Sequence, residues 1–166
     1  EVLSRGVSQC VTISPPVSWD THTDSDNLQS QLWEFFFQNM NRLAARLSAT
    51  PAPIVAGQSN GTLADDTIVV VLSEMARTPQ LNAENGRDHW PWTSVMLFGN
   101  GITGGRAIGG YDDGYGGLGI DPGTCEIDAS RASPTPAQLG ATLMALADVD
   151  PTVLGPGIEP LTGLIE

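Results

Sequence analysis

A run of β-branched residues, TIVVVL at residues 67–72, sets the first requirement on any fold of this chain. Its lack of polar interruption is typical of a strand that is buried on both faces, as in a parallel sheet. The apolar residues of 6–14 (GVSQCVTIS) predict another strand, which Pro15 and Pro16 would end. The segment 93–98 (TSVMLF) predicts a third strand.

Two segments have the periodicity of helices. Apolar residues recur at three- and four-residue spacing over 28–47, where Asp26 or Asn27 can cap the helix and the apolar stripe is expected to face the core. Residues 136–147 predict a second helix, because Thr135 can cap it and a proline occupies the first helical position. The resulting order of strand, helix, strand, strand, loop and helix favours part of an α/β sheet.

Glycine dominates the segment between the last strand and the second helix. Ten of the residues from 99 to 119 are glycine, so the whole of 99–135 is expected to be a loop insertion. The sequon Asn60-Gly61-Thr62 is expected to form a turn, and the residues from 151 onward an irregular tail. At 166 residues, the chain is expected to form a single domain over 1–166.

The charge of the chain restricts its partners. Its seven Lys and Arg residues, all of them arginine, face 19 Asp and Glu residues, which gives a formal net charge of −12. Nucleic acids and anionic lipids are bound largely through cations, so neither is an expected partner. The apolar runs are too short for membrane insertion. The remaining ligands are a metal ion, a neutral molecule, or an anion that arginine meets locally.

The two cysteines do not define a site. Cys10 and Cys125 lie far apart in the sequence and lack the CxxC spacing of a zinc knuckle or a thioredoxin-like motif. The sequence is compatible with a single disulfide and with two unpaired thiols, because the state of the cysteines depends on whether the protein is exported.

The two histidines of the chain have matching neighbours. His22 follows Asp20 by two positions and His89 follows Asp88 directly, and a tryptophan lies close to each pair. Imidazole and carboxylate together form the ligand set of Zn²⁺, Mn²⁺ or Fe²⁺, and a carboxylate is also the usual partner of a ligating histidine. These four residues are therefore candidate metal ligands, with surface or capping histidines as the alternative.

A fifth candidate ligand, Glu74, lies just past the strand predicted at 67–72. Asp20 and His22 lie just past another predicted strand in the same way. Open parallel sheets bind their ligands at the carboxyl ends of strands. We therefore expect Glu74 to converge with His22 and His89, although a carboxylate at a helix start is the alternative for Glu74.

Two arginines accompany these acids. Arg77 and Arg87 could each hold a phosphate or sulfate group, because a guanidinium presents two parallel donors to such an oxyanion. Either arginine could instead form an ion pair with Glu74 or Asp88.

Several of these segments, in this order, closely resemble the bacterial domain-of-unknown-function family 1501, a family of exported proteins grouped with the alkaline phosphatase superfamily. The resemblance covers nearly the whole chain. The matching segments are 19–22 (WDTH), 67–79, 85–90, 94–105, 135–139 and 146–151.

The resemblance implies an α/β, alkaline-phosphatase-like fold, with a mostly parallel sheet flanked by helices and one or two divalent metals (Zn, Mn, Mg or Ca) at the strand ends. It also implies that this chain is the C-terminal portion of a larger domain, because family members are longer and the superfamily's hydroxyl nucleophile lies in the N-terminal half. Glu74 resembles the acidic ligand after a core strand, and His89 the later histidine. Asp20 and His22 resemble the Asp/His pair between them.

Two functions are consistent with the resemblance. The first is an exported, metal-dependent hydrolase of phosphate or sulfate esters, whose nucleophile comes from its own N-terminal half or from another chain. The second is a non-catalytic exported protein that keeps the fold as a structural or binding module and associates with another chain. Export to the periplasm or beyond the cell would also favour the Cys10–Cys125 disulfide.

Overall fold

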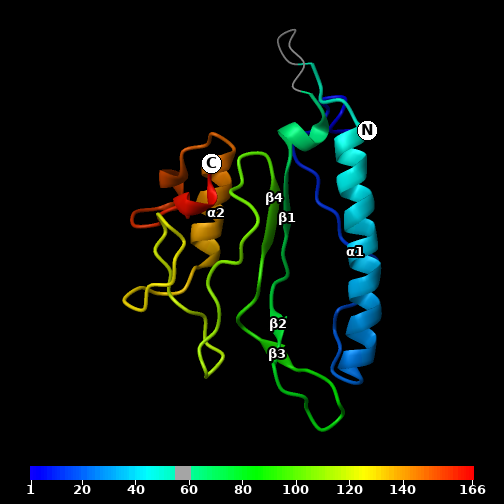
Figure 1. Ribbon diagram of the computed structural model, residues 1–166, viewed down its shortest axis with the longest axis vertical. Helices are drawn as coiled ribbons and strands as arrows, with labels where there is room; N and C mark the ends of the chain where they lie inside the picture. Colours follow the sequence, from blue (N-terminus) through cyan, green and yellow to red (C-terminus); the bar gives the residue numbers. More distant parts are fainter. Residues whose placement is uncertain (55–60) are drawn as a thin grey trace. The chain divides into compact units, whose positions relative to one another are not determined.

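The computed structural model describes residues 1–54 and 61–166, which divide into two compact units, 1–100 and 101–166. Each unit contains one α-helix, α1 in the first and α2 in the second (Figure 1). Asn60, the first residue of the sequon, lies outside the described residues. We expect residues 1–166 to form a single domain that is itself part of a larger one. This expectation stays a prediction.

The helix α1 (Ser25–Ala49) confirms the helix predicted from apolar periodicity. Its N-cap is Asp24, which has the left-handed conformation with φ of 44°, and not Asp26 or Asn27. The Asn27 side chain donates a hydrogen bond to Asp24 Oδ2 at 3.1 Å. Although α1 has 25 residues, neither it nor any other helix of the described residues is long and apolar enough to cross a membrane.

The apolar stripe of α1 faces a core along only part of its length. Of its members, Leu47 is buried, Leu32, Phe36, Met40 and Leu43 are half-buried, and Leu28 and Phe35 are exposed. The expectation that this stripe is core is therefore wrong for Leu28 and Phe35. A helix of 25 residues is about 37 Å long, whereas a strand of four residues is about 13 Å long. The small sheet beside α1 is too short to cover it.

The strand β1 (Ile68–Val71) pairs with β4 (Met96–Gly99) in an antiparallel ladder. Strands predicted at 67–72 and 93–98 are therefore present, with slightly shifted bounds. All four residues of β1 are half-buried, so the expected burial on both faces is wrong. The sheet has two strands among the described residues, so it is too narrow to form the extended, covered layer that buries both faces of a central strand.

The second sheet of this unit is shorter still. The strand β2 (Ala76–Arg77) pairs with β3 (His89–Trp90), again antiparallel. All strand pairs and isolated bridges of the described residues are antiparallel. The mostly parallel, alkaline-phosphatase-like fold implied by the family resemblance stays a prediction.

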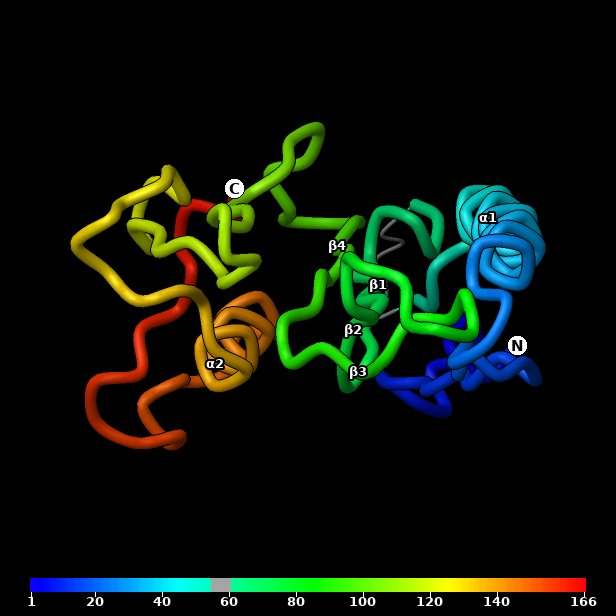
Figure 2. Tube along the Cα trace, turned by 90° about the horizontal axis from the view of Figure 1, so that it is seen from below, coloured from blue at the N-terminus to red at the C-terminus, as the bar shows by residue number. Residues whose placement is uncertain are grey.

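Residues 6–14 do not form the predicted strand. Figure 2 shows the N-terminal segment as an irregular trace, and Val7 and Ile13 are 74% and 71% exposed. The segment makes local hydrogen bonds instead, such as Ser8 Oγ to the Cys10 carbonyl at 2.6 Å. Apolar residues make a segment compatible with a strand, but a strand also needs a neighbouring edge, and this segment pairs with none in the described chain.

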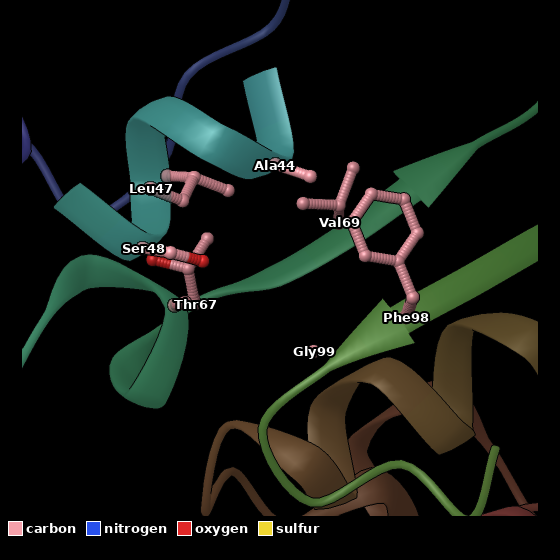
Figure 3. Close-up of a pocket in the computed structure, with 8 residues that line it drawn as sticks. Ala44, Leu47, Ser48, Thr67, Val69, Phe98 and Gly99 are labelled. Atoms are coloured by element: carbon pink, nitrogen blue, oxygen red, sulfur yellow. The ribbon is translucent and has the colours of Figure 1, made fainter. Parts of the chain in front are cut away.

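A cavity of about 160 Å³ lies between α1 and the β1–β4 sheet (Figure 3). Ala44 and Leu47 of α1, Val69 of β1 and Phe98 of β4 line it. Leu47 is the buried hydrophobic residue of the helix at this point. The space between helix and sheet is thus lined mainly by apolar side chains, which do not fill it completely.

The helix α2 (Pro136–Leu146) of the second unit confirms the other predicted helix. A capping box starts it, in which Thr135 Oγ1 accepts from Gln138 N at 3.2 Å and Gln138 Oε1 accepts from Thr135 N at 3.1 Å. Pro136 occupies the first helical position, as expected, because a proline has no N–H group to leave unsatisfied there.

Residues 101–135 contain no helix or strand, in agreement with their glycine content. They nevertheless contribute to a small core, in which Ile120 and Cys125 are buried together with Leu161. Both cysteines are free thiols, Cys10 exposed and Cys125 buried. Burial raises the pKa of the Cys125 thiol.

The residues from 151 onward are not the irregular tail that the sequence predicts. Short 3₁₀ helices span Pro151–Leu154 and Thr162–Leu164. Ile165 forms an antiparallel bridge with Ile102. The segment folds back because it contributes the buried Leu161 and the partly buried Leu164 to the core of the second unit.

Thr142 fixes this C-terminal segment to α2. Its side chain is fully buried; Oγ1 donates to the Gln138 carbonyl at 2.7 Å and accepts from Leu161 N at 2.8 Å. We expect Thr142→Val to lower the free energy of unfolding by about 1–3 kcal/mol, because the buried Leu161 N–H loses its acceptor. Thr142→Ser keeps the hydroxyl and is the control in denaturant unfolding. Equal stability of the two variants would contradict this role of the hydroxyl.

Candidate metal centre

Three of the predicted ligand side chains converge in the first unit. Asp20 Oδ1 lies 2.7 Å from His22 Nδ1 and 3.7 Å from His89 Nε2. The two imidazole rings lie side by side, with their centroids 4.9 Å apart. One ligand atom from each of the three residues lies within 4.8 Å of the others. The side chains are about half exposed, so solvent and small ligands reach them.

The β2–β3 ladder adds Arg77 to this group. Arg77 pairs with His89 in the register of the ladder, and directly opposed residues project on the same face of an antiparallel sheet. Arg77 Nη2 donates to Asp20 Oδ1 at 2.5 Å, and Nη1 donates to the Arg87 carbonyl at 3.2 Å. The hydrogen bond from Arg77 is the main reason that the pKa of Asp20 lies below its usual range, so this carboxylate is ionised at neutral pH.

The segment that carries Asp20 and His22 is fixed to α1 through the residue between them, Thr21. Between them, Thr21 is 2% exposed, and its Oγ1 accepts from Gln29 Nε2 at 2.9 Å and lies 3.2 Å from Ser25 Oγ. These contacts fix the backbone on both sides of the buried threonine. The first two turns of α1 therefore position the two ligands.

The loop between β2 and β3 holds the same segment from the other side. Asn82 Nδ2 donates to the His22 carbonyl at 3.0 Å, and Arg87 N donates to the Thr21 carbonyl at 3.0 Å. Gly86 is buried at this contact, where a Cβ atom would lie 1.7 Å from the His22 carbonyl oxygen. Only glycine permits the two backbones to approach so closely.

Sequence reasoning did not single out Asn82 or Gly86. The signal was available in part, because the dipeptide Asn85-Gly86 is a strong turn signal. That Gly86 then packs against a carbonyl more than 60 positions earlier is a long-range contact, which no local pattern reveals.

Two of the five predicted ligands lie outside the group. Glu74 is exposed and accepts a hydrogen bond from Ser73 Oγ at 3.3 Å. Asp88 Oδ1 accepts from Asn82 Nδ2 at 3.1 Å. The predicted convergence of Glu74 with the histidines is not found. It assumed neighbouring parallel strands, and one of those strands does not form.

The two arginines also differ from each other. Arg77 reaches the group and pairs with Asp20, not with Glu74. Arg87 instead donates to the carbonyls of Thr78, at 3.1 Å, and Pro79, and pairs with Asp26 at 3.2 Å. Its guanidinium is thus occupied in joining the loop to the start of α1. Of the two predicted oxyanion-binding residues, only Arg77 lies beside the candidate ligands.

The donor set of Asp20, His22 and His89 fits a transition metal better than Mg²⁺ or Ca²⁺. Imidazole suits Zn²⁺ and Fe²⁺, whereas Mg²⁺ and Ca²⁺ prefer oxygen ligands alone. Ligand atoms on one tetrahedral zinc ion lie about 3.4 Å apart, because each bond is about 2.0–2.2 Å long. A closure of up to about 1.4 Å would therefore allow the three residues to share an ion. Three protein ligands also leave a position for water or substrate.

The family is established by comparison with known proteins. The family model described as "Protein of unknown function (DUF1501)" matches residues 2–154, and the chain belongs to this family. No curated protein and no solved structure matches the chain.

Proposed function

We propose that this chain carries the metal centre of an exported hydrolase of phosphate or sulfate esters with an alkaline-phosphatase-like fold. The observation that supports this proposal most directly is the convergence of Asp20, His22 and His89 beside Arg77. Two imidazoles and a carboxylate can hold a divalent ion, and a guanidinium beside them can bind an ester oxyanion. A bound ion would supply Lewis-acid activation of the ester.

The residues of this chain have distinct tasks in the proposed enzyme. Asp20, His22 and His89 bind the ion, and Arg77 binds the oxyanion. Arg87 positions the β2–β3 loop, since its guanidinium donates to two carbonyls of that loop. The nucleophile would come from the protein's N-terminal half or from another chain.

Metal binding by the chain tests the proposal. We expect equilibrium dialysis to give one Zn²⁺ or Mn²⁺ per chain, and binding of Mg²⁺ and Ca²⁺ to be at least about tenfold weaker, because the site contains two nitrogen ligands. Turnover of a phosphate or sulfate ester by the complete protein would then establish the reaction class. Absence of stoichiometric Zn²⁺ or Mn²⁺ binding would contradict the proposal.

A second candidate function is a non-catalytic module that binds another polypeptide. The first unit buries three hydrophobic residues among those described, Leu47, Ala52 and Leu63. Large apolar side chains remain exposed on it; examples are Leu28, Trp33, Phe35, Phe37 and Leu72. Contiguous exposed apolar surface marks contact sites for further protein, and the exposed rings of Trp33 and Phe37 stack with their centroids 5.6 Å apart. Stoichiometric metal binding without ester turnover by the complete protein would favour this second function.

A further inference from the structure

The charges at the metal centre do not balance once an ion is present. Asp20 is the one carboxylate in the group of ligand atoms. The Asp26 carboxylate is paired with Arg87, and that of Asp88, which accepts a hydrogen bond from the neutral Asn82 side chain, lies outside the group. Within the group itself, a divalent ion held by neutral imidazoles and Asp20, beside Arg77, would leave two positive charges uncompensated.

Arg77 and the ion would also compete for the same atom. Arg77 Nη2 and His22 Nδ1 both meet Asp20 Oδ1, at 2.5 and 2.7 Å. An ion bonded to His22 Nδ1 and this oxygen would stand next to the guanidinium, and the two cations would repel each other. Arg77 is 17% exposed and is fixed through Nη1 to the Arg87 carbonyl, so it cannot simply leave the site.

A tetrahedral dianion resolves both conflicts. Phosphate carries two negative charges near neutral pH, which match the two that are uncompensated. Its oxygens can accept parallel N–H bonds from a guanidinium. Arg77 could then turn Nη2 from Asp20 to the dianion while Nη1 keeps its hydrogen bond to the Arg87 carbonyl.

We propose that a divalent ion and a tetrahedral dianion bind at this centre with positive coupling. Arg77 couples the two because its Nη2 group transfers its hydrogen bond from Asp20 to the dianion. The inference rests on the proposed function, which supplies the ion. Coupling between two ligands is reciprocal, so each must raise the affinity of the other by the same factor. The centre would thus favour esters with a dianionic group, such as phosphate monoesters, over monoanionic esters.

Titration of the unmodified chain with Mn²⁺ tests the coupling without any activity assay. Free Mn²⁺ is followed by electron paramagnetic resonance, with and without inorganic phosphate, and protein-free blanks correct for Mn²⁺–phosphate complexes. We expect phosphate to tighten Mn²⁺ binding about tenfold, within the usual range of 5–150-fold for coupled sites. Acetate, a monoanion, is the control and is expected to change the affinity less than twofold.

The variant Arg77→Gln separates coupling from a structural role. With the competing cation removed, Mn²⁺ alone is expected to bind at least as tightly as in the unmodified chain, while the effect of phosphate falls below twofold. A merely structural role of Arg77 would weaken Mn²⁺ binding in both conditions. Arg42→Gln, which removes the same charge from an exposed position on α1, is the matched control and keeps the tenfold coupling.

The possible outcomes distinguish this inference from the proposed function. If the unmodified chain binds neither Mn²⁺ nor Zn²⁺, the proposed function fails and the coupling fails with it. If Mn²⁺ binds but phosphate leaves its affinity unchanged, the coupling alone is overturned. This comparison uses the unmodified chain, so it decides the question even where Arg77→Gln does not fold.

Discussion

Gly86→Ala is expected to lower the free energy of unfolding of the first unit by about 3 kcal/mol or more. A Cβ atom at this position would lie 1.7 Å from the His22 carbonyl oxygen and 1.9 Å from its carbon, and both are backbone atoms. The loop must therefore move away from residues 21–25, with loss of the Arg87 N–Thr21 O and Ser25 N–Asn85 O hydrogen bonds. Each such bond contributes about 1 kcal/mol, and the side-chain bond from Asn82 adds to the loss.

The effect of this substitution is measured by thermal unfolding. For a unit of this size, a loss of about 3 kcal/mol corresponds to a decrease of roughly 10 °C or more in Tm. Gly104→Ala, in the second unit, is the control for a glycine substitution where a Cβ has space, because its nearest heavy atom, the Ile102 carbonyl oxygen, would lie at 4.0 Å. The control is expected to change stability by less than about 0.5 kcal/mol. Similar Tm values for the two variants would show that the loop does not approach His22 as closely as described.

Local patterns predicted the helices well, because the forces that form them are local. The apolar spacing of α1 and the Thr135 cap of α2 lie within a few positions of the residues that they order. The pairing of β1 is different, because its sequence is compatible with either a parallel or an antiparallel neighbour. Only the position of β4 in space decides between them. The segment 6–14 shows the same limit, since its apolar residues do not reveal whether a strand edge is available.

The sequence predicted part of the site. The argument that placed its residues together, however, differs from the contacts that bring them together in the structure. The matching contexts of His22 and His89 nominated both histidines, together with Asp20 and Asp88, as ligands, and the structure brings Asp20 and both histidines together. The argument from strand ends, however, also placed Glu74 there. The actual determinants are the register of the β2–β3 ladder and the close approach at Gly86. Both are contacts between distant parts of the sequence.

Substitution of the histidines is expected to give the largest change in metal affinity. If Asp20, His22 and His89 hold one ion, His22→Ala and His89→Ala will each remove one of three protein ligands. Loss of a residue that only supports a ligand costs about 10–100-fold in affinity. We therefore expect each alanine variant to weaken Zn²⁺ binding by about 100-fold or more, measured by competition with a chromophoric chelator.

Glu74→Gln and Asp88→Asn provide the contrast that makes this prediction specific. The sequence nominates both residues as ligands, and both stand next to or near members of the group along the chain. The structure places their carboxylates outside it, with Glu74 bonded to Ser73 and Asp88 to Asn82. Each variant loses one negative charge without losing a ligand, so Zn²⁺ affinity is expected to fall less than about threefold, as for a weak exposed charge interaction. A larger loss in Glu74→Gln than in His22→Ala would mean that the ion binds where the strand-end argument put it, and that the converged histidines are not its ligands.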